Sequence, residues 1–245
     1  AAEPGDLEEG SAMKIRIKFS KQGSMKFIGH LDMMRYFQKA MRRGDVDIRY
    51  SEGFSPHQIM SFAAPLGVGI TSNGEYLDIE VLSTENSRTM TDRLNSVMVD
   101  EIRILSYRKL EDSSKNAMSL VSAADYTLKF REGYRPKDFD AFFKALQTFY
   151  DQDRIPVIKQ TKKGTREMDL KPFVYRLERR ENHIFMQVST GSTDNVKPEF
   201  VMETFYREMG WEYPGFAFQI QREEVYGRND AGHPIPLEEF GENIE

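Results

Sequence analysis

The 245-residue chain contains no cysteine. Disulfides, thiolate zinc sites, a cysteine nucleophile and an iron–sulfur cluster ligated by the chain itself are therefore excluded. The absence fits a reducing compartment, and no run approaches the roughly 18 consecutive apolar residues of a membrane helix. No charged-then-apolar signal segment stands at the start. We therefore expect a cytoplasmic protein with no membrane partner.

The sequence also lacks the motifs that mark common enzyme classes. GxGxxG, GxxxxGK(S/T), GxSxG, HExxH and protein-kinase signatures are all absent. Their absence weighs against nucleotide-hydrolysing and serine-hydrolase chemistry, and we expect no bound cofactor. At 39% hydrophobic and 12% aromatic residues, the chain can nevertheless bury sizeable cores.

Charge is unevenly distributed along the chain. The formal net charge is -5, and the first twelve residues carry four acids and no base, so residues 13–245 sum to -1 (-5 + 4). Those twelve residues are small and acidic, and we predict a tag or disordered tail over 1–12. Residues 13–50 hold ten Lys/Arg against three Asp. That excess favours either an anion-binding surface or a solvated face.

Hydrophobic periodicity predicts a β-α-β-β-α-β unit in residues 13–110. Residues 14–19 alternate apolar and basic side chains, which is typical of a half-buried strand. A helix is expected to begin near His30 and to end at Gly44. Its inward face is predicted to consist of Leu31, Met34, Phe37 and Met41. Further strands are predicted at 46–50, 75–81 and 102–104, and a second helix at 90–97.

A polar segment at 110–117 is interpreted as a linker, and the same order repeats in residues 118–226 with one inserted strand. The fold class predicted is α+β, as two tandem ferredoxin-like sandwiches with antiparallel sheets. A single domain stays open as the alternative. Residues 227–245 lack periodicity and are expected to form a loosely packed tail.

Two groups of basic residues are candidate nucleic-acid contacts. The first follows the outer face of the first helix, and the second lies at a glycine turn in the second unit. The candidates on the helix are Arg35, Lys39, Arg42 and Arg43, and those at the turn are Lys162, Lys163 and Arg166. A solvated helix face and a merely soluble turn remain the alternatives.

His30, Asp32 and His57 are the candidate catalytic residues. Two histidines and a carboxylate can bind a divalent ion or move protons. Their spacing matches no strong metal pattern, so no metal site is assigned. Asp32 is also suited to a helix N-terminus, and histidines that cap loops are the structural alternative.

The exposed sheet face is a third candidate, because the first and third strands are central in this fold. Arg16 and Lys18 on the first strand lie opposite Asp78 and Glu80 on the third. Cross-strand pairs between them would neutralise the face and disfavour RNA. In the second unit Phe185 is a single aromatic, whereas base stacking usually employs two or three.

Several stretches together resemble a family of bacterial proteins linked to radical SAM enzymes. They are KIRIKFSKQGSMKFIGHLDMMRYFQKAMRR, SEGFSPHQIMSFAAPLGVGITSNGEYLDIEV and IPVIKQTKKGTREMDLKPFV. The similarity runs from Met13 to about Tyr226, and its most specific parts are GHLD, SEGFSPH, PLGVG and KKGTREMDL. Members are encoded beside, or fused to, a cobalamin-binding-type radical SAM protein, often near ribosomal protein genes.

The resemblance implies an accessory or substrate-presenting role, with a radical SAM protein as partner and RNA of the translation apparatus, tRNA or rRNA, as ligand. Without cysteine, the chain itself cannot carry the cluster. We therefore expect a non-catalytic accessory protein. The alternatives are a metal-dependent hydrolase or nuclease centred on His30, Asp32 and His57, and a structural adaptor that binds protein alone.

Overall fold

The computed structural model describes residues 12–161, 164–192 and 194–245. The tag or tail predicted at 1–12 falls almost entirely outside these ranges. The N-terminal half contains β1 (Met13–Lys21), η1 (Gly23–Phe27), α1 (His30–Arg43), β2 (Met60–Phe62), β3 (Thr71–Val81), α2 (Ser87–Ser96) and β4 (Ile102–Lys109). The following segment contains α3 (Ala117–Leu120), β5 (Ala123–Phe130), α4 (Phe139–Tyr150), β6 (Pro156–Thr161), β7 (Gly164–Asp169) and η2 (Lys171–Phe173). The last part contains β8 (Val174–Arg180), β9 (His183–Ser189), α5 (Pro198–Glu208), β10 (Phe218–Arg228), β11 (Pro234–Pro236), η3 (Leu237–Phe240) and β12 (Glu242–Asn243).

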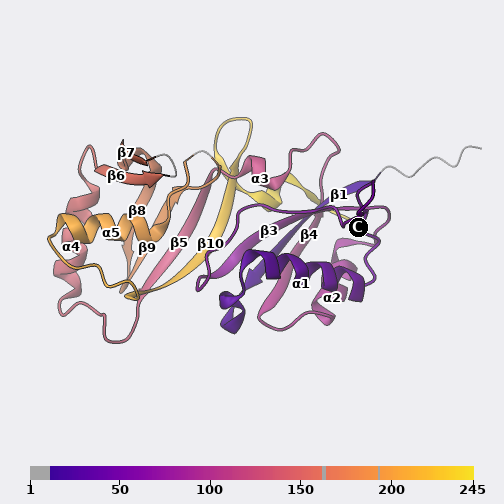
Figure 1. Cartoon of the computed structure of the whole chain (residues 1–245), viewed down its shortest axis with the longest axis horizontal. Coiled ribbons are helices and arrows are strands. Elements are labelled where there is room, and N and C mark those ends of the chain that lie inside the picture. Colours follow the sequence, from indigo (N-terminus) through magenta and orange to yellow (C-terminus); the bar gives the residue numbers. More distant parts are fainter. Residues whose placement is uncertain (1–11, 162–163, 193) are drawn as a thin grey trace, which may run out of the picture.

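Ten of these strands form one continuous sheet in the order β12-β4-β1-β3-β10-β5-β9-β8, with β2 on β3 and β11 on β10. Strands β6 and β7 form a separate hairpin. Among the described pairings, only β3 with β10 is parallel. Figure 1 shows α1 and α2 over the strands of the N-terminal half and α4 and α5 over those of the other half.

The predicted α+β class with largely antiparallel strands is confirmed. The two halves do not form separate sheets, however, because β3 and β10 join them. The strand predicted at 46–50 is also wrong: that segment makes only the isolated bridges of Ile48 with Val81 and Tyr50 with Gln58. The second strand of this half is β2 instead.

The N-terminal core lies between α1, α2 and the sheet. Ile15, Ile17 and Phe19 point inward from β1, as their alternation predicts. On α1 the buried residues are Met33, Phe37, Ala40 and Met41. Leu31 was expected to face inward but is 67% exposed. The four buried residues follow the spacing i, i+4, i+7 and i+8 from Met33 and form one continuous apolar stripe along the helix. Leu31 falls outside that stripe.

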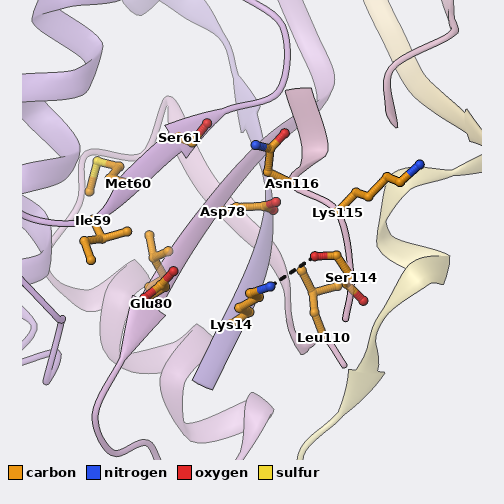
Figure 2. A pocket seen from close by; sticks show the side chains of 11 residues that line it. Lys14, Ile59, Met60, Ser61, Asp78, Glu80, Leu110, Ser114, Lys115 and Asn116 are labelled. Carbon is orange, nitrogen blue, oxygen red and sulfur yellow. Dashed lines mark hydrogen bonds between the residues drawn. The ribbon is translucent and has the colours of Figure 1, made fainter. Parts of the chain in front are cut away.

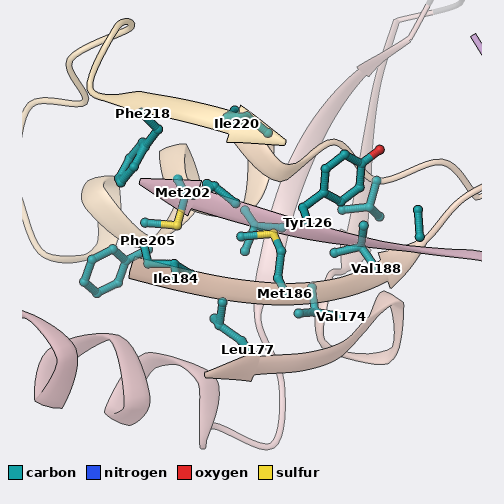
Figure 3. Packing of buried hydrophobic residues seen from close by; sticks show 14 of the residues in the cluster. Tyr126, Val174, Leu177, Ile184, Met186, Val188, Met202, Phe205, Phe218 and Ile220 are labelled. Atoms are coloured by element: carbon teal, nitrogen blue, oxygen red, sulfur yellow. The ribbon is translucent and has the colours of Figure 1, made fainter. Parts of the chain in front are cut away.

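The core of the other half combines Ile, Leu and Val side chains with many aromatic rings. Figure 3 shows Met186 and Ile184 of β9 beneath Tyr126 of β5, with Met202 and Phe205 of α5 packed from the helix side. On α4 the buried residues are Phe142, Phe143, Leu146 and Phe149. Asp138 caps α4 by accepting a hydrogen bond from the Ala141 N–H at 2.9 Å.

The segment from 229 to 245 is packed against both halves rather than loose, since β11 pairs with β10 and β12 with β4, so the expectation of a loosely packed tail at 227–245 is wrong. Leu237 is fully buried, and β12 pairs with β4. The Arg16 Nη1 donates to the Leu237 carbonyl at 3.0 Å. Ser87 N–H donates to the Ile244 carbonyl at 3.0 Å. These contacts cover the outer face of β1 and β4, which periodicity within the segment does not reveal.

A buried ion pair joins the two halves where β3 meets β10. Arg222 on β10 donates from Nε and Nη2 to the Glu75 carboxylate at 2.8 and 2.7 Å. Arg222 is 2% exposed and Glu75 5%. Ser72 Oγ donates to Glu75 at 2.6 Å, and Arg222 Nη2 also donates to the Ala64 carbonyl at 2.8 Å. Each charge therefore has several partners within the junction.

The protonation of Arg222 follows from this geometry. Burial alone would lower the pKa of Arg222, but the Glu75 carboxylate outweighs burial and raises it. Burial also lowers the pKa of nearby Lys21, whose Nζ donates to the Ile28 carbonyl at 2.6 Å. The junction thus contains a permanent guanidinium held by one carboxylate.

Replacing Arg222 with Met should lower the free energy of unfolding by about 3–5 kcal/mol, because Glu75 would keep a buried charge without its partner. Adding Glu75→Leu should recover most of that loss, since the buried carboxylate is then removed as well. Urea unfolding followed by circular dichroism measures both. As a control, Arg49→Met breaks the more exposed pair with Glu80 and should cost less than about 1 kcal/mol. An equally small loss for Arg222→Met would contradict the role assigned to the pair.

The Leu237→Ala variant tests whether the C-terminal segment stabilises the fold. Because Leu237 is fully buried, we expect the free energy of unfolding to fall by about 2–5 kcal/mol. Leu105→Ala on β4, where the side chain is 49% exposed, is the matched control and should change stability by at most about 0.5 kcal/mol. Equal effects of the two variants in the same denaturant titration would show that the segment is loose after all.

Candidate functional site

The outer face of α1 carries the four basic residues that its periodicity predicts there. Arg35, Lys39, Arg42 and Arg43 are all exposed. Arg35 contacts Asp32 at 3.1 Å, but both side chains are about two-thirds exposed or more, so the pair is weak. Within the described residues, the Arg42 side chain donates only to the Gln38 carbonyl, at 3.3 Å. In the described part of the chain, the side chains of Lys39 and Arg43 have no hydrogen bond or ion pair.

Exposed aromatic rings border this helix on one side. The loop 51–58 is held against α1 because Gln58 Nε2 donates to the Gln38 carbonyl at 3.2 Å. Phe54 in this loop is fully exposed, and Tyr50 at its start is 46% exposed. Tyr50 and Phe54 thus add exposed aromatic surface to the segment that contacts α1.

The N-terminal end of α1 adds further apolar surface. Phe27 is 64% exposed, next to Leu31, and the Lys26 ammonium lies 5.1 Å from the Phe27 ring centroid. The Gly69 N–H donates to the Lys26 carbonyl at 2.8 Å, which places exposed Val68 in the same neighbourhood. We call the whole region the α1 surface. It comprises Phe27, Leu31, Arg35, Lys39, Arg42, Arg43, Tyr50 and Phe54.

The three catalytic candidates have separate neighbours. The His30 ring lies 5.3 Å from the Phe62 ring, Asp32 pairs with Arg35, and His57 Nδ1 lies 2.8 Å from Ser51 Oγ. Among the described residues, no group of three or more His, Asp or Glu side chains could hold a metal ion. The geometry therefore gives no support to a metal-dependent hydrolase centred on these residues.

The basic turn is described only in part. Lys162 and Lys163 lie outside the described residues, whereas Arg166 is exposed on β7, opposite Lys159 on β6. Asp169 at the end of β7 accepts the Ile155 and Lys171 N–H groups at 2.8 and 3.0 Å. These backbone hydrogen bonds, the one from Ile155 foremost, hold the pKa of Asp169 below its usual range. Asp169 therefore fixes the base of the hairpin.

The sheet face of the N-terminal half is neutralised, although not by all the pairs expected. Arg16 is bidentate to Asp78 at 2.8 and 2.9 Å, as predicted. Lys18 instead pairs with Glu224 at 2.6 Å and Glu238 at 2.7 Å, both from the other end of the chain. Burial would raise the pKa of Glu238, but the ion pair with Lys18 outweighs it and lowers the value.

Phe185 on β9 is not an open stacking surface. It is 2% exposed, because the guanidinium carbons of Arg180 and Arg176 lie 3.4 and 5.2 Å from its ring centroid. Glu178 accepts hydrogen bonds from both arginines, which fixes them over the ring. A nucleobase would have to displace these cations before it could stack there.

A hollow of about 310 Å³ lies where the 110–117 segment crosses the sheet (Figure 2). Lys14 Nζ donates to the Asp112 and Ser114 carbonyls at 2.6 and 3.2 Å, and Asp78 accepts the Ala117 N–H at 2.6 Å. Figure 2 shows Met60 and Ile59 along the opposite wall. The principal charged groups thus fasten the connecting segment to the sheet, which is a structural role.

The largest feature that sequence reasoning missed is a cavity of about 550 Å³ at the boundary of the two halves. Five separate segments line it: the loop 63–70, Met118 of α3, β5, residues 190–192 and 195–199 around the start of α5, and β10. The PLGVG stretch and the KPE sequence that opens α5 are the signals in the sequence that could have indicated it. Its polar groups include Tyr126, Glu199 and Arg222.

In the described residues 12–161, 164–192 and 194–245, no helix is long and apolar enough to cross a membrane.

Comparison with known proteins places the chain in a family. No curated protein matches the chain. Residues 14–198 match the sequence pattern of a family described as an uncharacterized protein conserved in bacteria (DUF2344). Because the match covers well over half of the 245 residues, the chain belongs to that bacterial family.

Proposed function

We propose that the protein is a non-catalytic accessory that binds RNA through the α1 surface. The observation that carries this proposal is the mixture of exposed cations without strong partners and exposed aromatic rings on one surface. Lysine and arginine bind backbone phosphates, and aromatic rings stack on bases of any sequence. Arg166 on the exposed hairpin offers a second contact, and a role for Lys162 and Lys163 beside it stays a prediction.

RNA fits this surface better than an acidic protein does. An acidic partner would account for Lys39 and Arg43 but would not use a fully exposed Phe54. Single-stranded RNA offers both kinds of group at once, since its phosphates and unstacked bases alternate along the strand. Exposed rings lie at two places along α1: Phe27 just before its start, and Phe54 in the loop that contacts its middle at Gln38.

The accessory role follows from the resemblance to proteins linked to radical SAM enzymes. On this proposal the chain presents RNA of the translation apparatus, tRNA or rRNA, to a radical SAM partner. Because the chain has no cysteine to ligate an iron–sulfur cluster, the covalent chemistry belongs to that partner.

The strand order within each half supports an interpretation as two ferredoxin-like units. Across the sheet, the strands of the first half lie in the order β4-β1-β3-β2, and those of the second half in the order β10-β5-β9-β8. If the strands of each half are numbered along the chain, both orders are 4-1-3-2. Each unit also has two helices between its strands. On this interpretation β6 and β7 are an insertion, and the boundaries at 13–110 and 118–226 remain predictions.

Affinity purification from the native bacterium, with both protein and RNA identified, tests the partners. We expect a radical SAM protein and tRNA or rRNA fragments to be recovered with the tagged chain. The Lys39→Glu and Arg43→Glu double variant should lose the RNA and keep the protein. Recovery of the protein partner with no RNA from the unchanged chain would favour a purely structural adaptor, and recovery of neither would contradict the accessory role.

RNA binding by the purified protein should weaken steeply with salt, because binding releases counterions from the phosphates. The Lys39→Gln and Arg43→Gln double variant removes two positive charges. It should reduce the slope of log affinity against log salt concentration by about 1.4, since each single-strand phosphate contact contributes about 0.7. Fluorescence anisotropy with labelled tRNA and rRNA fragments measures this slope.

The matched control removes two exposed cations from helices of the other half, Lys144→Gln and Arg207→Gln, and should leave the slope unchanged. In the same titration Phe54→Ala should weaken binding at every salt concentration without altering the slope, because stacking involves no phosphate. Absence of binding at low salt, or an equal effect of both double variants, would exclude RNA binding through the α1 surface.

A further inference from the structure

The cavity at the boundary of the two halves has the size and walls of a small-ligand site. Its volume of about 550 Å³ lies within the range of roughly 300–1,000 Å³ that is usual for such sites. Ala63, Pro65, Ile70, Val196 and Pro198 supply apolar walls. A flat, largely apolar ring would replace water against these walls with little loss of hydrogen bonding.

Two buried polar groups in the cavity have unused hydrogen-bonding capacity. Glu199 Oε2 is buried and has no hydrogen-bond partner within the described chain. Tyr126 is 6% exposed, and its oxygen accepts only a long bond of 3.4 Å from Arg222 Nη1. The hydroxyl hydrogen of Tyr126 has no acceptor among the described residues. The cavity therefore offers one strong acceptor and one donor.

Electrostatics restrict the charge of a ligand here. Burial raises the pKa of Tyr126; Arg222 opposes the rise, and Glu75 and Glu199 add to it, so the phenol stays a neutral donor at physiological pH. The charge of Arg222 is already balanced by its bidentate contact with Glu75. A phosphate inside the cavity would meet the Glu199 carboxylate, and Lys197, the cation that is not already paired, lies at the exposed rim. A neutral group with a donor beside an acceptor would satisfy both unused groups.

We propose that this cavity binds an unstacked nucleobase, with Glu199 accepting a hydrogen bond from a ring N–H or exocyclic amine and Tyr126 donating to the adjacent carbonyl or ring nitrogen. Nucleobases are neutral flat rings whose edges place donors next to acceptors. The inference rests on the proposed RNA-binding function, because it identifies where a base of the bound strand is inserted.

The loop 63–70 lies between the cavity and the start of α1. Pro65 and Leu66 line both the cavity and a smaller hollow that contains His30 at the start of α1. Lys197, exposed at the rim beside Pro198, is positioned to contact the phosphate of an inserted nucleotide. A strand that follows α1 towards its N-terminal end can therefore reach the cavity.

The test uses the full chain and four free nucleosides, adenosine, guanosine, cytidine and uridine, titrated by calorimetry. At least one should bind the unchanged protein, and both Glu199→Ala and Tyr126→Phe should weaken that binding by about tenfold or more. Glu203→Ala is the matched control, because Glu203 is exposed one turn further along α5 and should leave binding unchanged. Thermal unfolding verifies that each variant folds. If Tyr126→Phe does not fold, the Glu199→Ala variant alone decides the test.

The outcomes separate this inference from the proposed function. The inference is overturned if no nucleoside binds the unchanged protein, or if Glu199→Ala and Glu203→Ala bind alike. The proposed function would survive either result if RNA still binds with the salt dependence set by Lys39 and Arg43. Conversely, nucleoside binding that depends on Glu199, with no RNA binding at low salt, would support the cavity as a nucleoside site and exclude the α1 surface as an RNA site.

Discussion

The ion pair of Arg222 with Glu75 is the contact on which the arrangement of the two halves depends. It lies at the parallel contact of β3 with β10, where only Gln221–Thr71 and Arg222–Ser72 are in register. Because this pairing is short, it supplies few backbone hydrogen bonds. The buried charges therefore specify how the two strands meet. Arg222 also binds the Ala64 carbonyl, so the same side chain positions the loop that separates the cavity from the hollow at His30.

The basic residues of the N-terminal half have two different roles that their sequence pattern does not distinguish. Those on β1 are enclosed by acids and carbonyls: Arg16 is fully buried, and Lys18 lies between two carboxylates. Those on α1 face outward, and Lys39 and Arg43 have no partner in the described chain. Excess charge that the fold leaves unpaired is the part available to a ligand, which is why the helix rather than the sheet is the candidate surface.

Local periodicity predicted most of the secondary structure and the outward face of α1, because these depend on residues a few positions apart. It also predicted the Arg16–Asp78 pair, which lies within one unit. It could not predict the partners of Lys18, which are more than 200 residues away, or a cavity built from five segments. The misplacement of Leu31 has a local cause, since the apolar residues of α1 fit two overlapping stripes and only packing selects the one through Met33.

The position of β10 has a consequence for how the chain folds during synthesis. This strand follows every other long strand in the sequence, yet it lies between β3 and β5 in the middle of the sheet. Until it is made, the start of β3 at Thr71 and Ser72 lacks its partner strand, and Glu75 has no arginine beside it. The Leu237 carbonyl that binds Arg16 is made later still, 221 residues after it. The N-terminal half therefore cannot complete these contacts until almost the whole chain has been made.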